Sequence, residues 1–295
     1  MAIRTILVPL SGGAASAGTI ETACRLAQRF GAHLEALHVR ADPREALPLL
    51  GTDLSASVTS ELIDAALRES DRNAATAKAA FDAAIARHAL PLRIRPRGAG
   101  QAAAGDPSAE WHEETGPASS IVARRTRLND LVILGQSGRV VDQPGTDVPE
   151  ETIVGGGRPV LLAPVRPVAP VGEVVAIAWN ASPQAARAVA AALPFLHQSR
   201  EVHILIAGKG SGEEDSADAE LATYLAWHGI AGMTDRVRPI DGVGIGELLL
   251  TAARDHGADL LVMGGYGRAP WREMIFGGAT RQIIGTSRLP ILLAH

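Results

Sequence analysis

Short, continuously apolar runs recur along the chain, and each is followed by turn residues. Three of them occur twice and in the same order: residues 4–11 and 173–180, residues 129–139 and 258–268, and residues 157–163 and 288–294. A run that is apolar at every position is typical of a strand covered on both faces, as in a parallel sheet, although a buried helix can look the same. Repetition in a fixed order favours strands, and it predicts one structural unit that is written twice.

Segments with helical spacing lie between these runs. Residues 14–30 carry apolar side chains at helical spacing and are followed by Gly31, which is typical of a helix end. In the second half, Ser182 and Pro183 suit the N-cap and first turn of a helix, and residues 244–256 predict another. This alternation predicts an α/β fold of Rossmann-like type, in which each half is an open, parallel, five-stranded sheet with helices on both faces.

A proline-rich segment divides the two halves. Residues 164–170 contain three prolines, a composition that favours a stiff, extended linker. We therefore predict a first domain at residues 1–165 and a second at residues 172–295. The first half is longer, and its surplus falls mostly at residues 43–90, where an alanine-rich stretch favours a long helix. This insert either covers the core or serves as a lid or interaction arm.

Length and composition fit two ordinary globular domains. The chain has 295 residues, of which 46% are apolar and 20% charged, with a net charge of −4. The acidic balance disfavours a nucleic-acid binder. Cys24 is the only cysteine, which excludes an intrachain disulfide and a cysteine-rich zinc site. Because we find neither a signal-peptide pattern nor an apolar run long enough for a membrane span, we expect a cytoplasmic protein.

Most of the functional signal lies in a glycine-rich segment at residues 263–280. A predicted strand ends at Met263, and the glycines that we single out after it are Gly264, Gly267, Gly277 and Gly278. Glycines let backbone N–H groups approach a phosphate closely, and open α/β sheets bind ligands at the carboxyl ends of their strands. A helix predicted from about Ala279 adds the positive end of its dipole. Glycines also permit a tight strand exit with close packing, so the segment alone does not identify a ligand.

The strand at residues 258–264, the Gly264-x-x-Gly267 spacing, the later glycine pair and the closing apolar run resemble the nucleotide-binding signature of the universal stress protein family. The whole chain resembles a tandem two-domain member, apart from residues 43–90 and the linker. The resemblance implies a fold of the adenine-nucleotide α-hydrolase type, two pseudo-two-fold-related domains paired through their last strands, and a role in stress response. Some members of the family bind ATP, and others do not.

The resemblance also implies which residues would contact a nucleotide. They are Asn180, Ile206, Met263, Gly264, Gly267, Arg268, Gly277, Gly278, Ala279 and Thr280. Two departures from the family pattern weaken this expectation. Asn180 stands where nucleotide-binding members usually have an aspartate near the adenine and ribose, and Gly278 stands where the family has serine or threonine.

The first half departs further from the family pattern. Gly135 and Gly138 match the first two glycines, but Val148 stands where the next glycine is needed and Ser11 takes the aspartate position. The glycines at residues 155–157 come too late and lead directly into the next strand, which leaves little room for a last helix with a free N-terminus. We therefore expect no nucleotide in this half.

Several other polar residues favour structural roles. Residues 111–114 lack the second histidine of H-E-x-x-H and are predicted to lie on a surface helix. His38 and His203 fall in predicted strands as core or edge histidines, and Cys24 fits a buried thiol better than a nucleophile. Trp179, beside Asn180, either stacks on a base or packs in the core.

Three functions stay open from the sequence. The leading one is a cytoplasmic regulatory module that binds adenine nucleotide, ATP with magnesium, in its second half and acts on an unidentified protein partner. The second is a slow ATP hydrolase, against which the missing carboxylate at Asn180 counts. The third is a nucleotide-free scaffold that acts through the long helices of the first half. Whether two such chains form a homodimer is also open, and we expect no contact with membranes.

Overall fold

The computed structural model describes residues 2–40, 56–94, 105–136, 148–208, 212–265 and 278–295. Strands and helices alternate throughout these ranges, as predicted. The first half comprises β1 (Thr5–Pro9), α1 (Ser16–Phe30), β2 (His33–Arg40), α3 (Ala56–His88), β3 (Ser108–Thr115), α4 (Ala118–Thr126), β4 (Leu131–Gly135), α5 (Val148–Gly155) and β5 (Val160–Ala163). The second comprises β6 (Val174–Ala178), α6 (Pro183–Leu196), β7 (Glu201–Ala207), α7 (Gly212–Trp227), β8 (Met233–Val237), α8 (Ile245–Asp255), β9 (Leu260–Gly264), α9 (Gly278–Thr286) and β10 (Ile291–Ala294).

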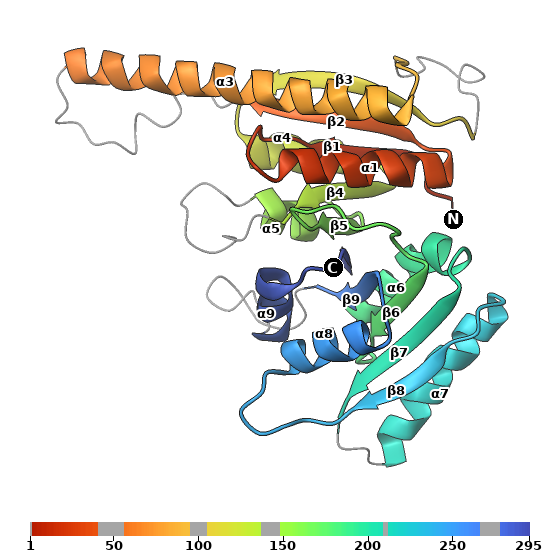
Figure 1. The fold of residues 1–295 in the computed structure, drawn as a ribbon. Coiled ribbons are helices and arrows are strands. Elements are labelled where there is room, and N and C mark those ends of the chain that lie inside the picture. Colours follow the sequence, from red (N-terminus) through yellow and green to blue (C-terminus); the bar gives the residue numbers. More distant parts are fainter. Residues whose placement is uncertain (1, 41–55, 95–104, 137–147, 209–211, 266–277) are drawn as a thin grey trace.

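The strands form a single twisted sheet in the order β3-β2-β1-β4-β5-β10-β9-β6-β7-β8 (Figure 1). Each half supplies five parallel strands, and the two halves join where β5 and β10 pair antiparallel. Leu161 faces Leu292 at the centre of this seam, and both side chains are fully buried. The predicted pairing through the last strands is therefore present within one chain.

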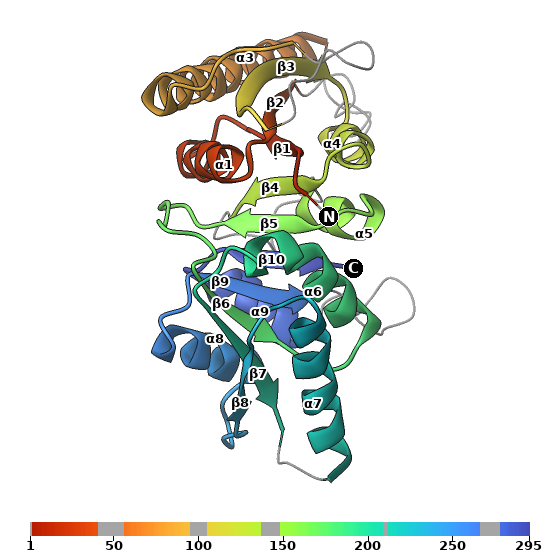
Figure 2. The same ribbon diagram turned by 90° about the vertical axis from the view of Figure 1, so that its right-hand side faces the viewer.

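Helices cover both faces of the sheet, which explains why most strands are apolar at every position. In the first half, α1 and α3 lie on one side of the strands and α4 and α5 on the other (Figure 2). Two apolar layers result: one holds inward side chains of α1, α3, α6 and α7, and the other those of α4, α5, α8 and α9. Within the described ranges, no helix is both long and apolar enough to span a membrane.

Arg29, near the end of α1, ties the two halves together. Its guanidinium donates hydrogen bonds to the backbone oxygens of Val171 and, at 3.1 Å, Gly172. Next to it, the rings of Phe30 and Phe195 meet edge to face with their centroids 4.9 Å apart. The linker between the halves is thus held against α1 and the end of α6.

Residues 111–114 lie in β3 and not in the predicted surface helix. β3 pairs with β2 over eight consecutive residues, and its side chains alternate between the two faces of the sheet. Trp111 packs toward α3, with its ring 5.3 Å from that of Phe81, while Glu110 and His112 point to the other face. An edge strand that buries only part of each face carries many polar residues, and this pattern misled the prediction.

The long helix predicted in the insert is present as α3. Its C-terminal part covers the core through buried side chains that include Ala77 and Phe81. Its N-terminal part extends beyond the sheet (Figure 1) and exposes Val58, Leu62 and Leu67. One helix therefore combines a core-covering part with a projecting part.

Candidate functional site

The predicted site residues that the structure describes lie at the carboxyl ends of three adjacent strands and at the start of α9. Ala178, the last residue of β6, is the register partner of both Leu205 in β7 and Met263 in β9. Asn180 and Ile206 follow just beyond this level on their own strands. The three strand ends therefore lie side by side, as parallel strands require. Gly267, Arg268 and Gly277 lie outside the described residues.

Asn180 shapes the turn that leads into α6. Its Oδ1 accepts a hydrogen bond from the Ser182 backbone N–H at 3.2 Å, and the Ser182 Oγ accepts one from the Ala185 N–H at 3.1 Å. Ser182 is thus the predicted N-cap, with Pro183 at the first helical position. The Asn180 Nδ2 makes no hydrogen bond to another described residue, and the side chain is exposed. One amide donor therefore stays available at the end of β6.

The first half has the same turn in the same place. Ser11 follows β1, and its Oγ accepts a hydrogen bond from the Gly13 N–H at 3.2 Å. A short polar side chain two residues before a backbone N–H stabilises such a turn whether or not a ligand binds. A polar residue at this position is therefore no evidence of a nucleotide by itself.

The first glycine of the motif is required by packing. A Cβ at Gly264 would lie 2.6 Å from the Ala185 backbone nitrogen at the start of α6. Gly135 is equivalent in the first half, where a Cβ would lie 2.5 Å from the Thr19 Oγ1 of α1. Both strands thus end against a neighbouring helix with no room for a side chain. This contact accounts for Gly264 without any ligand. Only the later glycines of the motif therefore still indicate a ligand-binding site.

Ile206 and Met263 point to opposite faces of the sheet. Ile206 belongs to the apolar layer under α6 and α7, whereas Met263 packs with Ile283 and Ile284 of α9. The structure therefore does not bring these two side chains together. A ligand that contacts Ile206 would reach Met263 only through its backbone.

Trp179 is level with Ile206 on the neighbouring strand. Its backbone N–H donates a hydrogen bond to the Leu205 oxygen at 2.9 Å, and its ring packs against the same apolar layer as Ile206. The indole Nε1 is buried and has no hydrogen-bond partner among the described residues. Buried donors usually find a partner, so this orphan donor is a feature of the site that a ligand can satisfy.

The two halves differ most at their last helices. α9 begins at Gly278, with Ala279 and Thr280 in its first turn. α5 begins at Val148 and ends at Gly155, so the glycines at 155–157 lie at its end and not before it. The sequence predicted little room for a last helix with a free N-terminus after these glycines, and β5 is the next element after them. A Cβ at Gly156 would lie 2.5 Å from the Thr126 Cγ2, so this glycine serves packing.

The insert also changes the surroundings of the first-half strand ends. A Cβ at Gly12, in the turn after β1, would lie 2.2 Å from the Asn73 backbone oxygen of α3. The middle of α3 therefore rests directly on the turn that corresponds to the Asn180 turn. α7, which occupies the equivalent place in the second half, has 16 residues against 33 in α3.

Comparisons with known proteins agree with this architecture. A universal stress protein from Archaeoglobus fulgidus DSM 4304 has a similar structure, with a TM-score of 0.65 and 16% identity over 98% of this chain and 95% of that one. A functionally unknown protein from Pseudomonas aeruginosa PAO1 follows with a TM-score of 0.54 and 14% identity over 99% of this chain and 92% of that one. A shorter universal stress protein, solved in complex with cAMP, is 17% identical over 56% of this chain and 99% of its own, with a TM-score of 0.31.

No curated protein sequence matches the chain. The universal stress protein family model matches residues 2–143 and 173–295, which span both halves of the sheet. The match covers most of the sequence and occurs once in each half, in agreement with the two five-stranded units. The chain belongs to the universal stress protein family, as a tandem member with two units.

Proposed function

We propose that the protein is a stress-response module whose second half binds an adenine nucleotide, ATP with magnesium, at the carboxyl ends of β6, β7 and β9. Membership of the universal stress protein family supports the stress-response role. The observation that carries the proposal is the place of the glycines relative to the last helix of each half. In the second half a glycine pair, Gly277 and Gly278, leads into α9, whereas in the first half the glycines at 155–157 lie at the end of α5.

Phosphate binding follows from this placement. A helix N-terminus presents unpaired N–H groups and the positive end of the helix dipole. Glycines before the helix leave the backbone open to a phosphate, and Thr280 lies in the first turn of α9. In the first half the corresponding start of α5 carries Val148 and is followed by Glu150 and Glu151, which disfavour an anion. We therefore assign the nucleotide to the second half alone.

Residues at the ends of β6 and β7 would recognise the base and the ribose. Ile206 and Trp179 supply an apolar surface on one face of the sheet. The Trp179 Nε1 and the Asn180 Nδ2 are hydrogen-bond donors without a partner among the described residues. Ring nitrogens and hydroxyl oxygens of an adenine nucleoside are suitable acceptors, so the residues present fit this ligand. Magnesium would arrive with the phosphates, because it binds through phosphate oxygens and water.

The same residues favour binding over hydrolysis. Asn180 is neutral and cannot act as a general base or as a charged ligand for magnesium. We infer a nucleotide sensor with at most slow turnover. A scaffold function is the second candidate, and the specific observation in its favour is the projecting part of α3 with exposed Val58, Leu62 and Leu67.

A thermal-shift series with paired variants tests the proposal. We expect ATP with magnesium, at about 100 times its Kd, to stabilise the chain by about 2.7 kcal/mol and raise Tm by several degrees. Asn180→Ala should weaken binding about fivefold through loss of one hydrogen bond. Ser11→Ala removes the equivalent turn contact in the first half and should leave the shift unchanged. AMP, cAMP and GTP identify the preferred nucleotide, and a Tm that no nucleotide changes would favour the scaffold.

A further inference from the structure

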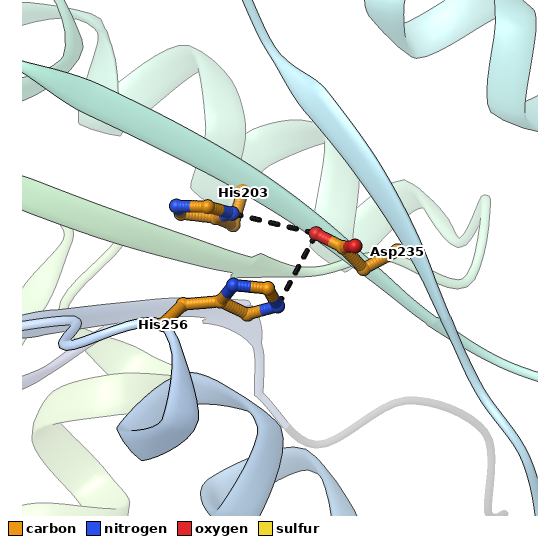
Figure 3. A group of neighbouring side chains, drawn as sticks. All are labelled: His203, Asp235 and His256. Atoms are coloured by element: carbon orange, nitrogen blue, oxygen red, sulfur yellow. Dashed lines mark hydrogen bonds and ion pairs between the residues drawn. The ribbon is translucent and has the colours of Figure 1, made fainter.

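His203, Asp235 and His256 meet on one face of the second half (Figure 3). The Asp235 Oδ2 lies 3.3 Å from the His203 Nδ1 and 3.3 Å from the His256 Nε2. The two imidazole rings lie nearly parallel, with centroids 4.1 Å apart and an angle of 20° between their planes. Each residue offers one ligand atom, and these atoms all lie within 4.8 Å of one another, which among the described residues is true of no other such trio.

Three different elements bring these side chains together. β7 and β8 pair in parallel, with His203 opposite Met233 and Leu205 opposite Asp235. Because side chains alternate along strands, His203 and Asp235 share the face that α8 covers. His256 caps the C-terminal end of α8, where its backbone N–H donates to the Ala252 oxygen at 3.1 Å. The trio therefore fixes the end of α8 to the edge of the sheet.

The two 3.3 Å contacts of Asp235 are long for hydrogen bonds between charged groups and also suit metal ligands. Charge-assisted hydrogen bonds between a nitrogen and a carboxylate are about 2.7–2.9 Å long, shorter than both 3.3 Å contacts of Asp235. In a tetrahedral zinc site with metal–ligand bonds of about 2.0–2.2 Å, neighbouring ligand atoms lie about 3.3–3.5 Å apart. Two of the three ligand–ligand distances thus already have the length that zinc requires. Two imidazoles also favour a transition metal over magnesium or calcium.

A carboxylate stands behind His203. Its second ring nitrogen, Nε2, is buried and has no hydrogen-bond partner among the described residues, and the Glu201 Oε2 lies 3.5 Å away. Metal-bound histidines usually donate their other N–H to a carboxylate, which fixes the tautomer and strengthens the ligand. When Nδ1 binds a metal, Nε2 carries the proton and faces Glu201. Glu201 is therefore placed to support a metal on the opposite side of the ring.

We propose that the His203 Nδ1, the Asp235 Oδ2 and the His256 Nε2 bind one Zn²⁺ ion, with water in the fourth position. His203 is buried, whereas Asp235 and His256 are partly exposed, so an ion can enter from solvent. Bound zinc links the edge strand β8 to β7 and to the end of α8. The site is separate from the proposed nucleotide site, because His203 and Ile206 point to opposite faces of β7.

The first half fills the same place with a closed ion pair. Glu35 corresponds to His203, because the preceding residues, Leu34 and Val202, pair with equivalent positions of β1 and β6. The Glu35 Oε1 accepts a hydrogen bond from the Arg125 Nη1 at 2.6 Å, and Oε2 accepts one from the Asn129 Nδ2 at 3.2 Å. A cation is thus already supplied by the protein there. The proposal therefore requires one zinc per chain, in the second half.

Zinc titration by calorimetry on untagged, chelator-treated protein tests this proposal, with Co²⁺ absorption as an independent report of tetrahedral coordination. We expect one ion per chain. His256→Gln and Asp235→Asn should weaken binding on the order of a hundredfold or more, and Glu201→Gln by about 10–100-fold. His197→Gln removes an exposed histidine of the same half outside the trio and should change nothing.

Two results would overturn the proposal. One is wild-type protein that binds no zinc, and the other is zinc binding that survives both His256→Gln and Asp235→Asn. Far-UV circular dichroism of the metal-free variants shows that they are folded, which is expected because both side chains are partly exposed. As a further expected result, zinc raises Tm of the wild type and of His197→Gln but not of the two ligand variants.

Discussion

At the scale of single residues, Cys24 shows how burial removes chemical reactivity. Its thiol lies on the inner side of α1 with no solvent exposure. Burial, together with the nearby charge of Glu21, raises the pKa of the Cys24 thiol to about 12. Because the thiolate is the reactive form, the residue is a structural thiol, as the sequence predicted.

A thiol reagent tests this assignment. At pH 8 the thiolate fraction of Cys24 is on the order of 10⁻⁴, and the surrounding core blocks access. We expect no measurable labelling of the native protein by an aromatic disulfide reagent over an hour. The same protein in denaturant should release one equivalent at once. Rapid labelling without denaturant would contradict the buried position of this residue.

Residues of the two proposed sites were predictable where they continue a repeat. Asn180 and Gly264 follow strands that recur in both halves, so their places at the strand ends could be read from the sequence. Asp235 and His256 belong to no motif and are far apart along the chain from His203. Only the pairing of β7 with β8 and the packing of α8 bring them together, and no spacing rule expresses such contacts.

At the scale of elements, the strands with apolar side chains on both faces were the easiest to predict. β3 was not, because it lies at an edge and six of its eight residues are polar. The position of the last helix of the first half could not be predicted either, because the glycines at 155–157 lie at the end of α5 and not before it. Tertiary position decided both cases, and a single sequence does not carry that information.

The attachment of α3 to α1 depends on Glu21. This side chain is almost fully buried and pairs with the His88 Nε2 at 2.8 Å and the Arg87 Nη1 at 2.7 Å. Burial alone would raise the pKa of the Glu21 carboxyl, but the hydrogen bonds from His88 and Arg87 outweigh it and lower the pKa. A carboxyl whose pKa is lowered on folding stabilises the protein above its unfolded pKa and loses this effect as pH falls through the folded pKa.

Glu21→Gln should therefore lower the free energy of unfolding by about 1 kcal/mol near pH 7. This is the contribution of a hydrogen-bonded charge pair, reduced because Arg87 is exposed to solvent. The difference from wild type should shrink as pH is lowered from 5 to 3. Denaturant unfolding at a series of pH values measures it. Asp82→Asn, which breaks an exposed pair with Lys78 on the same helix, serves as control and should stay within about 0.5 kcal/mol of wild type. A difference for Glu21→Gln that grows in acid would contradict this role.

At the scale of the whole molecule, the antiparallel pairing of β5 with β10 turns two five-stranded units into one sheet. The repeat made this arrangement predictable in outline, because two equivalent units can bury their last strands by pairing them with each other. The asymmetry between the units was also partly visible in the sequence, through Ser11 and Val148. What the sequence did not reveal is that α3 rests on the turn after β1, because that contact depends on where the insert packs.

We propose that only the second half binds a nucleotide, and a calorimetric titration of nucleotide-free protein with ATP and magnesium tests this proposal. We predict one ATP per chain. Gly267→Val should abolish binding, and Gly138→Val, the matched change in the first half, should leave it intact. The proposal would be contradicted by two ATP per chain, by no bound ATP, or by binding that survives Gly267→Val and is lost in Gly138→Val.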